Sequence, residues 1–344
     1  MRYRALIALS REESRQARER ALERTLSNLR SEPRVEVADY NYIRTASWVP
    51  NDPKFGDLAV DPSKDHGQWG LKTAQFPGAW YDVKDRKANI AILDSGIDTG
   101  HPDMVGKIAA QKNFFNGGTV VKDRYGHGTH VAGIAAALTN NGRGVAGGCP
   151  VCKLLVAKVM DSSGGVEDAN LILAIDWSVK HGADVINLSF GGSGGDAGNE
   201  VLGATIRKAY ARGTDAVVVA VAGNEGTNTK QCPAAYQKVI AVSATNENDR
   251  LASFSSRGSW VDLAAPGTRI LSTRAALTGG GYDRESGTSE AAPFVSALAA
   301  LLASEGKTAG EIRQRMQSTA TDLGPAGNDP YYGHGRIDAN KAVP

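Results

Sequence analysis

The chain has 344 residues, enough for one large domain alone or with a small second one. A net charge of +2 at pH 7 is close to balance, so we expect no nucleic acid partner. No apolar run reaches the roughly 20 residues of a membrane span, which argues against a membrane partner. The apolar stretch after Arg4 is also shorter than the core of a secretory signal, and the compartment is left unknown.

The first 46 residues form a segment of their own. Residues 11–30 are rich in Arg and Glu and carry three leucines on one stripe, which predicts a helix with a charged outer face. Residues 35–40 alternate between apolar and polar side chains, as a strand does. Pro50 and two Asp-Pro pairs then mark an extended, turn-rich connection, and we place a domain boundary near Ser47.

The pattern changes after residue 85. Short runs rich in Val, Ile, Leu and Ala predict strands at 88–94, 154–160, 184–190, 216–222 and 239–244. Helices are expected at 127–138, 168–181, 198–212, 288–304 and 311–320. Strands that are apolar on both faces and alternate with helices are typical of an α/β fold, with a mainly parallel central sheet flanked by helices.

Three cysteines, Cys149, Cys152 and Cys232, are an odd number, which argues against a framework of disulfides. Cys149 and Cys152 have the spacing of a redox motif or of half a zinc site, but a second pair is missing from the sequence. We therefore expect small, partly buried thiols. A local disulfide between Cys149 and Cys152 is the alternative.

An acid, a base and a hydroxyl occur in short segments that contain glycine. Asp94 ends an apolar strand, where the catalytic groups of open α/β sheets gather. His127 and Ser289 each begin an Ala-rich helix. In a nucleophilic hydrolase, Ser289 would attack a carbonyl and His127 would take up its proton and return it to the leaving group. Asp94 would orient the imidazole and stabilise its charged form.

The attack also needs a donor for the developing oxyanion. Asn224, just after the strand 216–222, is the candidate, together with the backbone N–H of Ser289 at a helix N-terminus. Each residue alone has an ordinary structural explanation, since strand-end Asp residues often cap helices and His or Asn beside Gly often lies in a turn. Four such contexts in one chain favour the catalytic interpretation.

These motifs give the chain a family resemblance. It resembles the subtilisin-like serine proteases (the subtilase superfamily), most of all their thermitase-like branch, in Asp94-Ser95-Gly96, His127-Gly128-Thr129-His130, Ala222-Gly223-Asn224 and Gly287-Thr288-Ser289. The chain order Asp, His, Ser is also that of subtilisin and differs from those of chymotrypsin and the α/β-hydrolases. The resemblance covers residues 48–344 and implies a three-layer subtilisin-like fold and a serine endopeptidase that cleaves polypeptides.

The resemblance also implies how a substrate binds. The substrate backbone would pair as an extra strand inside a cleft, with a mainly apolar P1 side chain. The two walls of this cleft would consist of Ser189, Phe190, Gly191, Ala222 and Gly223. Glu225 and Gln231 would lie near the pocket, where they either admit basic P1 residues or stay solvated at the rim.

A single structural calcium site is implied by the same resemblance. Six to eight oxygen ligands suit Ca²⁺. The matching ligands are the side chains of Asp52, Asp103 and Asn141 and the backbone carbonyls of Leu138, Arg143 and Val145. From the residues alone, Asp-Pro pairs would indicate only turns.

Residues 1–46 resemble the C-terminal part of a subtilase propeptide and are short for the whole α+β inhibitor domain. Residues 47–344 would then be the peptidase domain, and the N-terminal segment its intramolecular inhibitor, with cleavage near residues 46–48. The resemblance implies a secreted protein, although the sequence shows no signal peptide. We expect a monomer.

Glu290 departs from the family pattern, because many subtilases have Met after the nucleophile. Its carboxylate would either stabilise the charged form of His127 or turn away toward solvent. Two other functions remain open, a catalytically silent subtilase fold used for binding and a transpeptidating ligase on the same fold. The complete set Asp94, His127, Ser289 and Asn224 favours the hydrolase.

Overall fold

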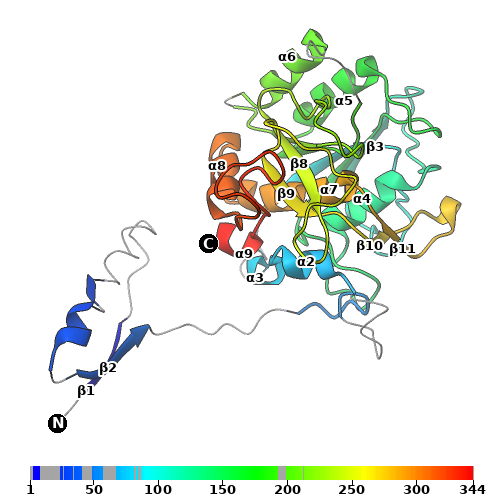
Figure 1. Ribbon diagram of the computed structural model, residues 1–344. Helices are drawn as coiled ribbons and strands as arrows, with labels where there is room; N and C mark the ends of the chain where they lie inside the picture. Colours follow the sequence, from blue (N-terminus) through cyan, green and yellow to red (C-terminus); the bar gives the residue numbers. More distant parts are fainter. Residues whose placement is uncertain are drawn as a thin grey trace. The chain divides into compact units, whose positions relative to one another are not determined.

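A computed structural model describes residues 3–7, 24–25, 27–33, 35–40, 49–56, 67–80, 83, 87–192, 199–211 and 213–343. Contacts within the chain divide it into two units, Met1–Ser47 and Trp48–Pro344 (Figure 1). Among the described residues, no helix is both long and apolar enough to cross a bilayer.

The N-terminal unit contains two parallel strands. β1 (Tyr3–Ile7) pairs with β2 (Val35–Tyr40), which confirms the strand expected at 35–40. The sequence does not predict β1, because a run of five residues is too short to distinguish a strand from a short apolar patch. Residues 24–25 and 27–31 are helical, and the rest of the helix predicted over 11–30 lies outside the described residues.

The C-terminal unit is built on a parallel sheet of seven strands in the order β4-β5-β3-β6-β7-β8-β9. These are β3 (Asn89–Asp94), β4 (Ile108–Asn113), β5 (Lys153–Lys158), β6 (Val185–Leu188), β7 (Val217–Val221), β8 (Val239–Thr245) and β9 (Leu263–Pro266). The five inner strands are those expected from apolar runs. The edge strands β4 and β9 are missed, because β4 is partly exposed and carries Gln111 and Lys112, while β9 has four residues and ends at a proline.

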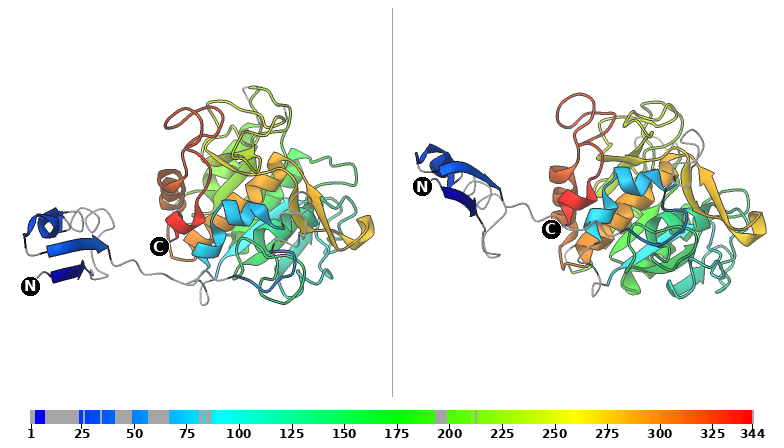
Figure 2. Two further views of the ribbon diagram at one scale, coloured as in Figure 1. Left: turned by 60° about the horizontal axis from the view of Figure 1, so that its bottom comes forward. Right: turned by 90° about the horizontal axis from the view of Figure 1, so that it is seen from below.

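Helices cover both faces of this sheet (Figures 1 and 2). α4 (His127–Ala136) and α7 (Thr288–Ala303) share a buried cluster with Ile90 and Ile92 of β3. α5 (Asp168–Lys180) and α6 (Glu200–Ala209) share another with Ala91 and Leu93, whose side chains point to the opposite face. Burial on both faces explains the wholly apolar strands and confirms the expected three-layer α/β fold.

Smaller elements complete the unit. They are α2 (Trp69–Thr73), α3 (Phe76–Ala79), β10 (Ile270–Thr273), the 3₁₀ turn η1 (Ala276–Thr278), β11 (Tyr282–Glu285), α8 (Ala309–Thr319) and α9 (Ala339–Ala342). β10 and β11 form an antiparallel hairpin. Two hydroxyls of β10 tie it to α4: Ser272 Oγ donates to the His130 carbonyl and Thr273 Oγ1 to the Thr129 carbonyl, both at 2.7 Å. The hairpin therefore anchors the helix that carries His127.

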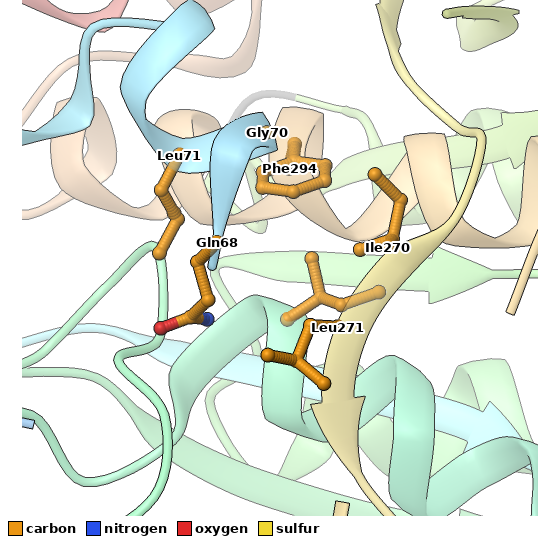
Figure 3. Close-up of a pocket in the computed structure, with 7 residues that line it drawn as sticks. Gln68, Gly70, Leu71, Ile270, Leu271 and Phe294 are labelled. Carbon is orange, nitrogen blue, oxygen red and sulfur yellow. The ribbon is translucent and has the colours of Figure 1, made fainter. Parts of the chain in front are cut away.

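A small pocket lies among α2, α4, β10 and α7 (Figure 3). Most of its lining is apolar, including Leu71, Ile270 and Phe294. Its polar member, Gln68, donates through Nε2 to the Ala146 carbonyl and accepts from the Ala146 N–H, each at 2.7 Å. Because the amide is already paired on both sides, the pocket is part of the core and offers no polar group to a substrate.

The close pair of cysteines forms a disulfide, so the expectation of two thiols is wrong. The backbone turns between Cys149 and Cys152, whose Cα atoms lie 5.4 Å apart, within the range that a disulfide spans. Both residues are fully buried in the main core. The odd number of cysteines gave no indication of this bond, because two cysteines within one turn can pair whatever the total number of cysteines is.

Candidate active site

Asp94 and His127 are paired at the carboxyl end of β3. His127 begins α4, and its Nδ1 lies 2.8 Å from Asp94 Oδ1 and 3.0 Å from Oδ2. Asp94 is fully buried and also accepts the Ser95 N–H at 2.7 Å. Since a carboxylate only accepts, Nδ1 carries the proton and Nε2 is left as a proton acceptor.

The surroundings favour the charged form of His127. Burial alone would lower the pKa of its imidazole, but the negative charge and hydrogen bond of Asp94, with Glu290 and Glu285 further away, outweigh it and raise the pKa. A general base must be neutral to accept a proton. The arrangement therefore suits catalysis on the alkaline side of neutrality.

Asp123, which the sequence analysis did not single out, holds the loop around this pair. It is buried; its Oδ1 accepts from Ser95 Oγ at 2.9 Å, and its Oδ2 from the Thr129 N–H at 2.9 Å and from the Thr129 hydroxyl at 2.6 Å. Ser95 Oγ in turn accepts the Gly128 N–H at 2.9 Å. An Asp a few residues before a helix is a common capping signal and could have identified it.

Ser289 is the second residue of α7, and its backbone is tied to β6. The Ser289 carbonyl accepts from Ser189 Oγ at 3.0 Å. Ser189 Oγ accepts from Asn187 Nδ2 at 2.8 Å, and Asn187 Oδ1 accepts from Ser296 Oγ at 2.7 Å. This chain of hydrogen bonds fixes the N-terminus of α7 over the end of a central strand.

Asn224 presents its side-chain amide toward the N-terminus of α7. Its Oδ1 accepts from the Thr288 N–H at 2.8 Å and from the Thr288 hydroxyl at 2.9 Å, so Nδ2 forms the other end. A Cβ on Gly287 would lie 2.7 Å from Ser289 Oγ and 3.3 Å from Asn224 Nδ2. The backbone at Gly287 is extended, so space and not a special conformation requires glycine there. Hydroxyl and amide thus face one small region, as an oxyanion site demands.

The residues expected to line the substrate cleft differ in burial. Phe190 is half-buried, whereas Ser189 is buried beneath Ser289. Beyond Gly191, Gly192 pairs with Cys232 in both directions at 3.0 Å. Ala222 is fully buried and Gly223 adopts a positive φ of 104°.

Glu225 and Gln231 both lie close to Gly223. A Cβ on Gly223 would lie 2.6 Å from Glu225 Oε2 and 2.7 Å from Gln231 Cγ. Glu225 is exposed and its Oε2 accepts from Ser256 Oγ at 3.0 Å. Gln231 is only 2% exposed, so it is not a solvated rim residue.

The comparison with protein families decides which enzymes this site belongs with. The model of the subtilase family matches residues 85–335. The chain belongs to the subtilase family. It is therefore a subtilisin-type serine protease.

Named relatives agree with this assignment. The subtilase is 40% identical over 323 residues to the thermophilic serine proteinase of Bacillus sp. (strain AK1), an alignment that covers 94% of the chain and 76% of the relative. It is 40% identical over 296 residues to thermitase of Thermoactinomyces vulgaris, covering 86% and 99%. It is 43% identical over 325 residues to subtilisin E of Bacillus subtilis (strain 168), covering 88% and 82%.

Glu290 in this subtilase does not turn toward solvent. Its side chain is buried, and Oε2 accepts from Ser289 Oγ at 3.1 Å. Burial raises the pKa of Glu290, but the interaction with His130, the charge of His127 and the hydrogen bond from Ser289 outweigh it and lower the pKa. The departure from the family pattern therefore places a carboxylate directly against the Ser289 hydroxyl.

Asp52 and Asp103, two of the residues expected at the calcium site, contact the same loop in this subtilase. Asp52 and Asp103 are both buried, and both bind the segment between Leu138 and Val145. Asp52 accepts the Asn140 N–H at 2.6 Å, and Asp103 accepts from Asn141 Nδ2 at 2.8 Å and from the Val145 N–H at 3.0 Å.

The charge of Asp103 acts on the carboxylate of Asp52. Burial raises the pKa of Asp52, the hydrogen bonds from Asn140 and Asn141 oppose this, and the nearby charge of Asp103 raises it further. Two buried carboxylates close together favour a bound cation, and their oxygens suit Ca²⁺. The two carboxylates therefore fit the ion, whereas Asn141 Oδ1 accepts the Arg143 N–H at 2.8 Å.

Proposed function

We propose that this subtilisin-like serine endopeptidase cleaves peptide bonds through an acyl-enzyme on Ser289. His127 would accept the Ser289 proton through Nε2 and pass it to the leaving amine, while Asp94 stabilises the imidazolium. The Nδ2 of Asn224 and the backbone N–H of Ser289 would stabilise the oxyanion. The convergence of Asn224 and Ser289 on the space left by Gly287 carries this proposal.

The hydroxyl of Ser289 must change partners for this reaction. It donates to Glu290 Oε2, and attack on a carbonyl requires it to turn to His127 Nε2. The carboxylate of Glu290 would thereby hold the nucleophile between turnovers.

A fluorophosphonate probe tests the nucleophile. The parent chain should be labelled, Ser289→Ala should not, and Ser253→Ala, which alters an exposed serine, should react as the parent does. Labelling of Ser289→Ala, or a folded parent that never reacts, would contradict the proposal. The second result would favour a silent binding protein, and transpeptidation products in excess of hydrolysis would favour a ligase.

The half-buried side chain of Phe190 supports a mainly apolar P1 preference, because it presents apolar surface. Digestion of a peptide library should show large apolar P1 residues in the majority of cleavage sites. A preference for Lys or Arg that disappears in Glu225→Gln would contradict this and assign Glu225 the selecting role.

Subtilases often bind calcium, and we place one structural Ca²⁺ in this chain. The ligands would be the side chains of Asp52, Asp103 and Asn141 and the carbonyls of Leu138, Arg143 and Val145. The ion would neutralise the two buried carboxylates and join the segment at Asp52 to the loop between Leu138 and Val145. Chelation should lower the melting temperature of Ser289→Ala protein, with recovery on adding Ca²⁺ and no effect in Asp52→Asn. Equal melting temperatures with and without chelator would refute the site.

Residues 1–46 would act as an inhibitory propeptide-like segment for the monomeric peptidase domain 47–344. N-terminal sequencing of active protein should find a start near residues 46–48. A fully active chain that still begins at Met1 would overturn this role.

A further inference from the structure

A second histidine of the active-site helix lies beside Glu290. The side chain of His130 is fully buried, and its Nε2 lies 3.1 Å from the Ile270 carbonyl and 3.2 Å from the Asp283 carbonyl. Because carbonyls only accept, Nε2 carries a proton, and in the neutral ring Nδ1 presents a lone pair.

Nδ1 of His130 faces another acceptor. Glu290 Oε1 lies 3.6 Å away, beyond hydrogen-bond distance, and neither atom has a hydrogen-bond partner among the described residues. Glu285 completes the cluster, since one ligand atom from each of the three side chains lies within 4.8 Å of the others. Two buried lone pairs that face each other require a cation between them, either a proton or a metal.

We propose that His130, Glu285 and Glu290 bind a transition-metal dication of the zinc class. Bonds of about 2.0–2.1 Å place two ligands of a tetrahedral zinc about 3.4 Å apart. The separation of 3.6 Å between His130 Nδ1 and Glu290 Oε1 is close to this value. One imidazole and two carboxylates leave a fourth position for water. Glu285 is only partly buried, so an ion can enter from its side.

The donor set separates this cluster from the proposed calcium site. An imidazole nitrogen suits zinc and its neighbours in the transition series, whereas Ca²⁺ takes oxygen ligands. The hydrogen bonds from Nε2 to the Ile270 and Asp283 carbonyls are of the kind that orients a metal-binding histidine.

A proton competes with the metal. The facing lone pairs of His130 Nδ1 and Glu290 Oε1 can hold a proton in place of the metal. Without metal, a protonated His130 therefore pairs with the two carboxylates. Zinc must displace this proton, so binding should release a proton and tighten as pH rises.

The metal would act on catalysis through Glu290. Exchanging one proton for a dication makes the cluster more positive by one charge, which should lower the pKa of nearby His127. Because Oε2 of Glu290 accepts the Ser289 hydroxyl, a metal on Oε1 also weakens that hydrogen bond. This coupling rests on the proposed roles of His127 and Ser289, whereas metal binding itself does not.

Titration calorimetry with Zn²⁺ tests the site directly. The full chain carrying Ser289→Ala, which prevents self-digestion, should bind one zinc and release a proton, seen as different heats in two buffers. Glu285→Gln should weaken binding about tenfold or more. Glu167→Gln, an exposed glutamate before α5, should bind as the parent does. An excess of Ca²⁺ should not compete.

Several results would overturn the proposal. Absence of zinc binding refutes it, as does equal affinity in the parent, Glu285→Gln and Glu290→Gln. Co²⁺ gives a second measurement, since its visible spectrum should show tetrahedral nitrogen and oxygen ligands in the parent but not in folded Glu290→Gln. In the active chain, zinc should shift the acid limb of kcat/KM to lower pH. Zinc that binds without this shift disproves the coupling to His127 and leaves the site in place.

Discussion

Replacing Gly133 by Ala tests how closely the active-site helix is packed. Gly133 lies in α4, and a Cβ there would overlap the hydroxyls of Ser272 and Thr273 and lie 3.0 Å from the Thr273 nitrogen. Those hydroxyls bond the His130 and Thr129 carbonyls, so they cannot move without breaking hydrogen bonds. These neighbours are two short side chains of β10, which their hydrogen bonds hold in place, and one backbone nitrogen.

The expected loss of free energy of unfolding in Gly133→Ala follows from these contacts. Overpacking a core costs about 1–3 kcal/mol, and each displaced hydroxyl forfeits about 1 kcal/mol. The better helix propensity of Ala returns only about 1 kcal/mol. We therefore expect Gly133→Ala to destabilise the protein by about 3 kcal/mol. The shift of α4 should also lower kcat/KM about tenfold, because His127 moves with its helix.

Denaturant unfolding of Ser289→Ala protein measures the free energy of unfolding without self-digestion. Gly310→Ala in α8 is the matched control, since its Cβ would have Tyr210 at 3.6 Å as nearest neighbour. That variant should be stabilised by about 0.5 kcal/mol. Gly203→Ala in α6, with Tyr236 at 3.3 Å, should fall between the two. If Gly133→Ala unfolds at the same denaturant concentration as the parent, the packing argument fails.

Three further predictions concern the chemistry. Asn224→Ala should lower kcat about 10²–10³-fold with little change in KM; an unchanged kcat would remove Asn224 from the oxyanion site. Because the pKa of His127 is raised, kcat/KM should fall as pH drops through it, and Glu290→Gln, which removes a charge that raises it, should move this acid limb to lower pH. A shift to higher pH would show that the charge of Glu290 does not raise the pKa of His127. Asp123→Asn should cost about 2 kcal/mol of stability and also lower kcat, because an amide cannot accept all the N–H and O–H groups that Asp123 accepts; stability equal to the parent's would show that these hydrogen bonds are dispensable.

The sequence alone determined the fold class and the main catalytic candidates. Inner strands buried on both faces produce long apolar runs, and the helices that begin at His127 and Thr288 produce a clear change of composition. The edge strands β4 and β9 escape this test because solvent or a short length weakens the pattern. The motifs around Asp94, His127, Asn224 and Ser289, together with their order, indicated the family that the comparisons show.

Only the tertiary structure decided how side chains distant in sequence act on one another. Asp123 joins the segments of Asp94 and His127, and Ser189 lies beneath Ser289, because parallel strands bring their carboxyl ends to one edge. Burial of Glu290 beside His130 depends on α4, α7 and the β10–β11 hairpin meeting, which no local pattern encodes. The Cys149–Cys152 disulfide likewise depends on the turn between them. The periodicity of apolar residues indicates which face of a helix or strand is buried, whereas contacts across the core depend on how the helices and strands pack.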